Sequence, residues 1–160
     1  MRRDSTFGVT EAARILGTSR DRLADWLCRR VFKPERPQRE LRPELTLCDL
    51  YRIYAALHLR ALGLRPEDAF QIPYSLIGDP VIRAEQDIAL VRLLEPPLGS
   101  PVWREVVPHK RGPAIGFSWG ELAELMHKEP VIVLPLQPMA RALLQEVDNY
   151  LGRTAAQGAI

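Results

Sequence analysis

The sequence predicts an α+β protein in which a basic, mainly helical head precedes a smaller body of mixed helices and strands. Residues 9–27 show the apolar periodicity of two short helices around a glycine, whereas the chain after Pro73 alternates short apolar runs with prolines. The charge divides in the same way. Residues 1–65 carry 14 Arg or Lys and 8 Asp or Glu, a net charge of +6, and residues 66–160 carry a net charge of −4. We therefore expect a nucleic-acid-binding head at 1–74, a body at 75–153 for dimerisation or for binding a partner or effector, and a flexible tail at 154–160.

The composition is that of a globular protein of 160 residues, of which 46% are hydrophobic. No apolar run approaches the roughly 18 residues of a membrane span, and no apolar leader follows residues 1–4. Cys28 and Cys48 lack the spacing of a ligand pair and are expected to be small core residues in a reducing compartment. These features favour a cytoplasmic protein with no membrane segment.

The first two helices follow each other closely. Thr10 is expected to cap the first helix, which carries an apolar stripe, and Gly17 suits the left-handed turn that ends it. Thr18 or Ser19 caps the second helix, which is expected to run through Arg29 and Arg30. Two helices joined in this way can place the second one in a DNA major groove, with Arg20 and Arg22 exposed at its N-terminal end.

A basic loop follows the second helix. Three prolines between residues 31 and 43 exclude a helix, and four cations recur every three residues: Lys33, Arg36, Arg39 and Arg42. Such a loop next to a recognition helix is typical of a wing, whose cations reach phosphates or the minor groove. A solvated linker is the alternative.

The head is predicted to end with two further helices. Thr46 and Asp49 form a capping box, and the helix after them is amphipathic and ends at Gly63. Pro66 then begins a short helix that reaches about Ile72.

The body is expected to contain short strands and three helices. Residues 79–94 are predicted as a helix, although 88–91 could instead form a strand. Strands are expected at 102–107 and 114–117, around a turn at 110–112, and at 131–136. Ser118 and Glu121 form a capping box for another helix, and Pro138 begins a last helix that ends at Gly152.

Candidate chemistry is sparse. His58, His109 and His127 lie on separate elements, and no spacing of residues matches a catalytic, metal or cofactor site, so we expect a protein that is not an enzyme. Trp103, Phe117 and Trp119 could line a ligand pocket, although aromatic residues beside strands more often belong to the core.

Residues 7–72 resemble the winged helix-turn-helix head of the MerR family of transcription regulators. The family's small helix, Gly, capping Ser and Leu-x-x-Trp helix correspond to residues 10–26, and its Lys-Pro at the start of the wing corresponds to Lys33-Pro34. Its Thr-x-x-Asp-Leu, its Leu-Gly and its short acidic helix correspond to residues 46–50, 62–63 and 64–72. The resemblance covers about two-fifths of the chain, and none is recognised for the remainder.

The chain also departs from the family pattern. Ala24 and Asp25 replace the Arg-Tyr that precedes the tryptophan, Arg30 replaces the glycine that closes the recognition helix, and residues 43–45 replace the Arg-x-Tyr of the wing. Prolines after position 72 exclude the long dimerising helix that usually follows the head.

The resemblance implies a sequence-specific DNA-binding regulator. No cofactor is expected, because no cofactor motif is present in the sequence. The residues expected to contact double-stranded DNA are Thr18, Ser19, Arg20, Arg22, Arg30, Lys33, Arg36, Arg39 and Arg42. Two alternatives stay open: an excisionase-like or phage small-terminase-like DNA-binding component, and an adaptor whose head has lost DNA binding.

We also expect a homodimer, because one head buries little surface on DNA. The predicted contact is the apolar stripe of the last helix, which contains Leu143, Leu144 and Val147. The alternative is that this stripe covers the sheet of its own chain.

Overall fold

The computed structural model describes residues 5–35, 43–93, 103–107, 117–128 and 130–157. Its mixture of helices with small, mainly antiparallel sheets confirms the α+β class. The N-terminal part contains β1 (Thr6–Gly8), α1 (Val9–Ile15), α2 (Arg20–Cys28), β2 (Glu44–Thr46), α3 (Leu47–Ala61) and α4 (Pro66–Ala69). The short strands β1 and β2 pair antiparallel, with Phe7 opposite Leu45.

The N-cap of α1 differs from the predicted one, whereas the N-cap of α2 is one of the two predicted residues. Helix α1 begins directly after β1, with Gly8 at its N-cap, so the prediction that Thr10 caps it is wrong. The Gly8 N–H donates to Glu11 Oε2 at 2.8 Å, which places Thr10 inside the first turn. Of the two predicted caps for α2, the structure has Ser19, whose Oγ accepts from the Arg22 N–H at 3.2 Å. Helix α2 ends at Cys28, two residues before the predicted end.

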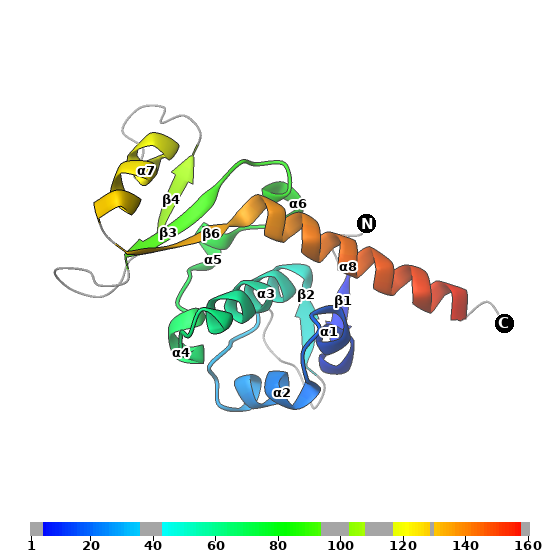
Figure 1. Cartoon of the computed structure of the whole chain (residues 1–160). Coiled ribbons are helices and arrows are strands. Elements are labelled where there is room, and N and C mark those ends of the chain that lie inside the picture. Colours follow the sequence, from blue (N-terminus) through cyan, green and yellow to red (C-terminus); the bar gives the residue numbers. More distant parts are fainter. Residues whose placement is uncertain (1–4, 36–42, 94–102, 108–116, 129, 158–160) are drawn as a thin grey trace.

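The C-terminal part adds α5 (Tyr74–Ile77), α6 (Pro80–Arg83), β3 (Ala89–Leu93), β4 (Arg104–Val107), β5 (Phe117–Ser118), α7 (Trp119–Lys128), β6 (Val131–Pro135) and α8 (Leu136–Gln157). The strands form one sheet in the order β5-β4-β3-β6. Figure 1 shows β4, β3 and β6 of this sheet. The long helix predicted at 79–94 is wrong: α6 has four residues, and the strand alternative corresponds to β3.

The connection between β4 and β5 also differs from the prediction. The two strands are parallel, with Val106 beside Phe117, so they are not a hairpin around a turn at 110–112. Parallel neighbours need a crossover connection and cannot be joined by a tight turn. The predicted turn lies outside the described residues. The predicted capping box of α7 is confirmed, since the Ser118 N–H donates to Glu121 Oε2 and the Glu121 N–H donates to Ser118 Oγ.

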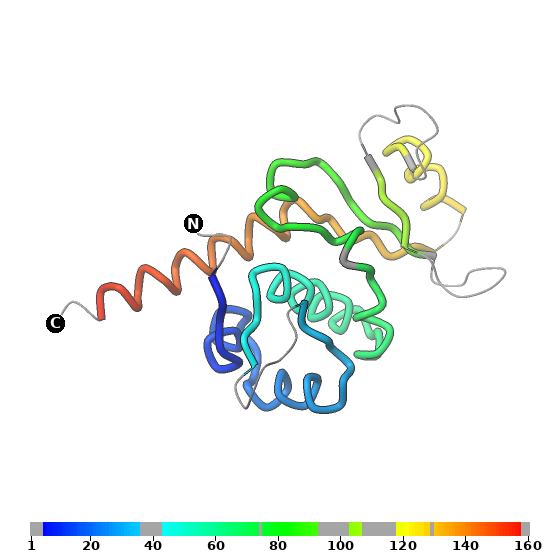
Figure 2. Tube along the Cα trace, turned by 180° about the vertical axis from the view of Figure 1, so that it is seen from behind, coloured from blue at the N-terminus to red at the C-terminus, as the bar shows by residue number. Residues whose placement is uncertain are grey.

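Helix α8 is longer than predicted at both ends. It begins at Leu136 rather than Pro138, and it continues through Gly152 to Gln157, so residues 154–157 are helical and not a flexible tail. A glycine inside a helix costs only about 1 kcal/mol, and the alanines at 155 and 156 are good helix formers. Figures 1 and 2 show the C-terminal half of α8 running beyond the rest of the molecule.

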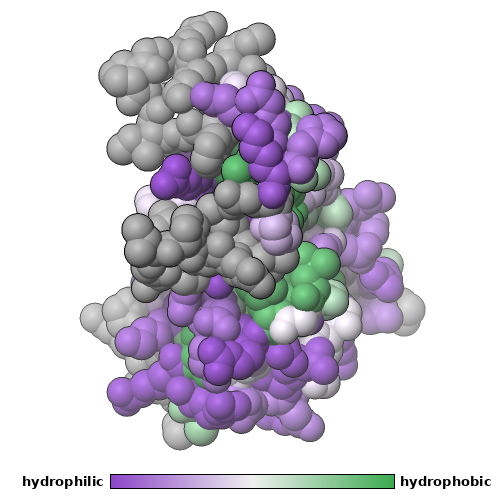
Figure 3. All heavy atoms as spheres, turned by 60° about the vertical axis from the view of Figure 1, so that its left-hand side comes forward, coloured by the Kyte–Doolittle hydropathy of each residue, from purple (hydrophilic) through white to green (hydrophobic). Residues whose placement is uncertain are grey.

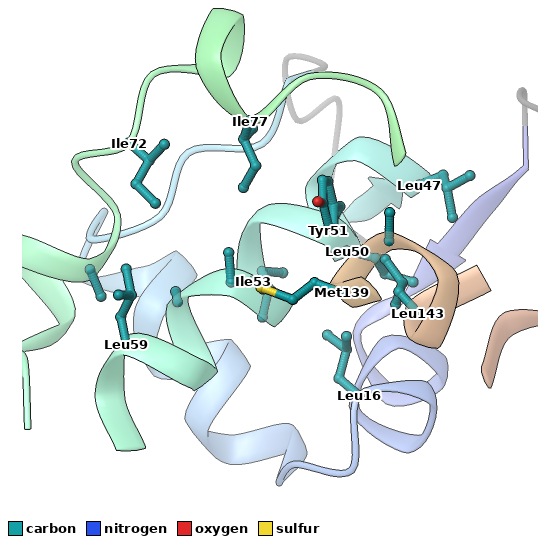
Figure 4. Packing of buried hydrophobic residues seen from close by; sticks show 14 of the residues in the cluster. Leu16, Leu47, Leu50, Tyr51, Ile53, Leu59, Ile72, Ile77, Met139 and Leu143 are labelled. Atoms are coloured by element: carbon teal, nitrogen blue, oxygen red, sulfur yellow. The ribbon is translucent and has the colours of Figure 1, made fainter. Parts of the chain in front are cut away.

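Helix α3 lies at the centre of the main core. Its buried side chains pack against residues of α1, α5 and α8 in one cluster, so the two predicted domains share a core (Figure 4). The Tyr51 hydroxyl is buried and donates to the Leu136 carbonyl oxygen at 2.7 Å. Burial raises the pKa of Tyr51 far above its ordinary value, an effect that the nearby Arg83 charge partly offsets. The hydroxyl therefore remains a donor at all physiological pH values.

The predicted dimer contact on α8 is occupied by the chain itself. Leu143 and Val147 are buried, and Leu144 packs against the main cluster. The alternative, in which this stripe covers its own chain, is the one that the structure has.

A smaller cluster between the sheet and α7 contains Ala89, Val91, Val106 and Leu122.

Candidate nucleic-acid interface

The turn between α1 and α2 is held by hydrogen bonds of the Schellman type. Gly17 has φ +62°, the Thr18 N–H donates to the Ala13 carbonyl at 3.0 Å, and the Gly17 N–H donates to the Arg14 carbonyl at 3.4 Å. Leu23 and Trp26 of α2 are buried, and the Trp26 ring meets the Phe70 ring edge-on at 5.1 Å. This packing leaves the opposite side of α2 in contact with solvent.

The exposed side of α2 combines cations with carboxylates. Arg20 and Arg22 are exposed at its first turn, and Arg22 Nη1 donates to Thr18 Oγ1 at 3.4 Å. At 100° per residue, the direction opposite the buried side belongs to Asp21, Asp25 and Cys28, and the two arginines flank it. Hydrophilic side chains cover most of the lower part of the molecule, where α2 lies (Figures 1 and 3). The N-terminal end of α2 is thus a charged surface of mixed sign.

Arg29 is a charged residue that the sequence-based set omitted. Its guanidinium is 3.4 Å from Asp25 Oδ2 and 3.2 Å from Glu67 Oε1 of α4, with 56% of the side chain exposed. The spacing of four residues between Asp25 and Arg29 is the signal that could have predicted the first contact. The two carboxylates balance the Arg29 charge, so this arginine is less available to an anion than Arg20 or Arg22.

Arg30 occupies a position that normally takes glycine. Its φ is +56°, the only positive φ of a non-glycine residue in the described ranges, and its N–H donates to the Leu27 carbonyl at 3.1 Å. Gly63 has the same role after α3, with φ +92°. A side chain in this left-handed conformation costs about 1–2 kcal/mol, so Arg30 is strained and exposed.

Replacing Arg30 by Gly is therefore expected to raise the free energy of unfolding by about 0.5–1 kcal/mol, because the relief of strain exceeds the extra entropy of glycine in the unfolded chain. Urea denaturation followed by circular dichroism measures the change. Arg30→Lys, which keeps both the strain and the charge, is the matched control and should leave stability unchanged. A loss of stability in R30G would contradict this account of the helix end.

The two ends of the basic loop are held together by the buried carboxylate of Asp49. Its Oδ1 accepts from the Glu35 N–H and its Oδ2 from the Thr46 N–H, both at 2.9 Å. Thr46 Oγ1 in turn accepts from the Asp49 N–H at 3.1 Å, which confirms the predicted capping box. The carboxylate thus connects α3 to the last residue described before the loop and to the end of β2.

Of the four predicted loop cations, only Lys33 lies within the described residues, and it is exposed. Arg36, Arg39 and Arg42 lie outside them. The Lys33 carbonyl accepts from Arg52 Nη1 at 3.2 Å, and the Arg52 guanidinium lies over the Phe32 ring at 5.1 Å from its centroid. Arg52 was not among the predicted site residues, because only the fold brings α3 to the start of this loop.

The histidines do not form a metal site in the described part of the chain. His58 Nδ1 lies 2.9 Å from the Tyr54 carbonyl oxygen, His127 is exposed, and His109 lies outside the described residues. Within the described ranges, no three His, Cys, Asp or Glu residues are grouped closely enough to hold a metal ion. None of the helices described there is both long and apolar enough to cross a membrane.

A cleft of about 360 Å³ lies where α8 meets α1. Its lining includes Arg14, Glu146, Tyr150 and Arg153. The Tyr150 hydroxyl donates to Glu11 Oε1 at 3.2 Å, which connects the C-terminal helix directly to the first helix of the head. Two arginines and one glutamate thus give the lining of this cleft charges of both signs.

In comparisons with known proteins, no protein-family model and no curated protein matches the chain. The resemblance to MerR heads therefore stays a prediction.

Proposed function

We propose that the protein is a cytoplasmic, sequence-specific DNA-binding transcription regulator of MerR-like type, and not an enzyme. The observation that carries the proposal is the exposed N-terminal turn of α2, where Arg20 and Arg22 follow the Ser19 cap. Arginines at this end of a second helix meet guanine edges and phosphates when the helix enters a major groove.

The basic loop would act beside this helix. Asp49 anchors the chain on both sides of the loop, at Glu35 and Thr46, so the loop leaves and rejoins the head at neighbouring points. Cations on a loop anchored in this way can reach the phosphates next to the bound groove.

Selection of bound fragments from the source genome, followed by sequencing, tests the function. A regulator is expected to enrich a common sequence upstream of genes. Enrichment at phage packaging or integration sites would instead favour the excisionase-like or terminase-like alternative. No enrichment, together with no gel shift on random DNA at low salt, would contradict both DNA-binding functions.

The adaptor alternative is favoured by one specific observation. Asp21 and Asp25 occupy the outermost side of α2, and Asp25 with Glu67 balances Arg29. This reduces the positive charge that the helix offers to phosphates. In the main proposal these aspartates would instead accept from cytosine N4 in the major groove.

The loop cations are expected to act mainly through phosphates. Replacing Lys33, Arg36, Arg39 and Arg42 by Gln, one at a time, should reduce the slope of log K against log salt by roughly one each, because each neutral residue releases one counterion fewer. Gel shifts at several salt concentrations measure the slope. A slope that is constant across all four variants would show that the loop does not contact DNA.

A homodimer remains part of the proposal, since two heads would double a small DNA contact. The two chains must contact each other through a surface that does not include Leu143 and Val147, because both side chains are buried within their own chain. Light scattering is expected to give the mass of two chains at tens of micromolar. The mass of one chain at that concentration would overturn the dimer.

A further inference from the structure

Two neighbouring side chains, Arg92 in β3 and Trp103 just before β4, have buried donors without acceptors among the described residues. Nε and Nη1 of Arg92 and Nε1 of Trp103 are buried and have no hydrogen-bond partner among the residues that the structure describes. Only 5% of Trp103 is exposed. Buried donors have a hydrogen-bond partner in the great majority of cases. A buried donor without a partner lowers the stability of the folded state by about 1–3 kcal/mol, and by more where the donor is charged.

The register of the sheet explains why these donors converge. Ala89, Leu90 and Val91 of β3 pair with Val106, Glu105 and Arg104 of β4, so the next position places Arg92 beside Trp103. The Arg92 Cζ lies 5.9 Å from the centroid of the Trp103 ring. On the other side of β3, Arg92 pairs with Ile132 of β6. The donors therefore lie on an apolar part of the sheet, beside an aromatic ring and an aliphatic side chain.

Arg83, the buried arginine of the body in the described ranges, offers a direct contrast. Arg83 is 8% exposed and donates to Glu105 Oε1, Gln86 Oε1 and the carbonyl oxygens of two α5 residues. No carboxylate lies within ion-pair distance of Arg92 in the described part of the chain. Glu105, which pairs with Leu90 two residues before Arg92, forms its ion pair with Arg83. Among the described residues, the Arg83 charge is therefore paired with a carboxylate and the Arg92 charge is not.

We propose that Arg92 and Trp103 form a binding site for a small organic carboxylate with an apolar body. The carboxylate accepts from the Arg92 guanidinium and from the Trp103 N–H, which supplies the missing acceptors and the missing negative charge. Its apolar body lies against the indole ring and Ile132. Three donors and one positive charge suit a single carboxylate better than a phosphate dianion. This ligand site is separate from the proposed DNA-binding function, and it can be tested without DNA.

The test is thermal unfolding of the full-length protein, followed by circular dichroism, with sodium benzoate as the probe. Sodium phosphate and sodium chloride at equal ionic strength are the comparison arms. Benzoate is expected to raise Tm in a saturable way, because a ligand that binds only the folded state stabilises it by mass action. Chloride should give no saturable shift.

Three variants make the assignment specific. Arg92→Met should abolish the benzoate response, while the ligand-free variant should be as stable as the wild type or more stable, because an unpaired buried cation has been removed. Trp103→Phe removes one neutral donor and should weaken benzoate binding by about threefold to tenfold. Arg104→Met removes the same charge from the neighbouring, exposed position of β4 and should leave the response intact.

The outcomes separate the possibilities. No saturable benzoate shift in the wild type, or a full response in R92M, would overturn the site. A shift with phosphate but not with benzoate would overturn the carboxylate assignment. A ligand-free R92M that melts well below the wild type would show that Arg92 has acceptors within the folded chain, which also overturns the proposal.

Discussion

Replacing Arg83 by Met is expected to lower the free energy of unfolding by about 3–5 kcal/mol, the range found when one partner of a buried ion pair is removed. Arg83 Nη2 lies 2.9 Å from Glu105 Oε1 and 2.7 Å from the Leu76 carbonyl oxygen, and Nε lies 3.1 Å from the Ile77 carbonyl oxygen. The side chain thus joins α5, α6 and β4. Methionine fills a similar volume but leaves a carboxylate and two carbonyl groups without their donors.

Urea denaturation followed by circular dichroism measures the loss. Glu105→Gln retains an acceptor for Arg83 and should cost clearly less than R83M. Arg65→Met is the matched control: the Arg65 side chain is 80% exposed although it lies 3.2 Å from Asp68, so its removal should change stability by about 0.5 kcal/mol or less. A change in R83M no larger than that in R65M would contradict the role assigned to Arg83.

Gly78 makes this arrangement possible. Its φ is +70°, and a Cβ atom built on it would lie 2.7 Å from Arg83 Nε. The glycine thus gives both the left-handed turn after α5 and the space for the guanidinium. Nothing near Arg83 in the sequence marks it as buried, because its carboxylate partner is 22 residues away on another element.

Local signals predicted the elements whose determinants lie within a few residues. The capping boxes at Thr46 and Ser118 and the cap at Ser19 are hydrogen bonds over three residues, and each is present. The class of the fold followed from the same periodicities. Three-residue strands such as β1 and β2 depend on pairing across 38 residues, from Phe7 to Leu45, so no local pattern could reveal them.

The errors in the body have the same cause. The stretch 79–94 contains helix and strand formers in succession, and its division at residue 84 depends on the pairing of β3 with β4 and β6. The apolar stripe of α8 was visible in the sequence. Its pattern does not show whether the stripe contacts a second chain or packs on the core of its own chain. Contacts of α8 with α3 and the sheet decide that question.

The candidate interface was predictable in part. Helical periodicity correctly placed Arg20 and Arg22 on the exposed side of α2. The positive φ of Arg30 was not predicted from the sequence. The contacts of Arg29 with Glu67 and of Arg52 with the Lys33 carbonyl depend on the packing of α4 and α3, so the sequence alone could not give them.

Replacing Arg20 and Arg22 together by Ala is expected to weaken binding to the selected DNA site by about 2–6 kcal/mol, at about 1–3 kcal/mol for each base contact. Both side chains are exposed, and the cap of α2 depends on Ser19 Oγ and the Arg22 backbone N–H, which alanine retains. The fold should therefore survive. Fluorescence anisotropy with the selected site and with a scrambled site of equal length measures the loss and its dependence on sequence.

Arg60→Ala is the matched control, because it removes an exposed arginine at the end of α3, away from the first turn of α2. It should weaken binding to both DNAs slightly and equally. Affinity of the double variant for the selected site equal to that of R60A would contradict the placement of α2 in the groove. A loss that is equal on the selected and the scrambled site would assign the two arginines to phosphates, since only base contacts distinguish one sequence from another.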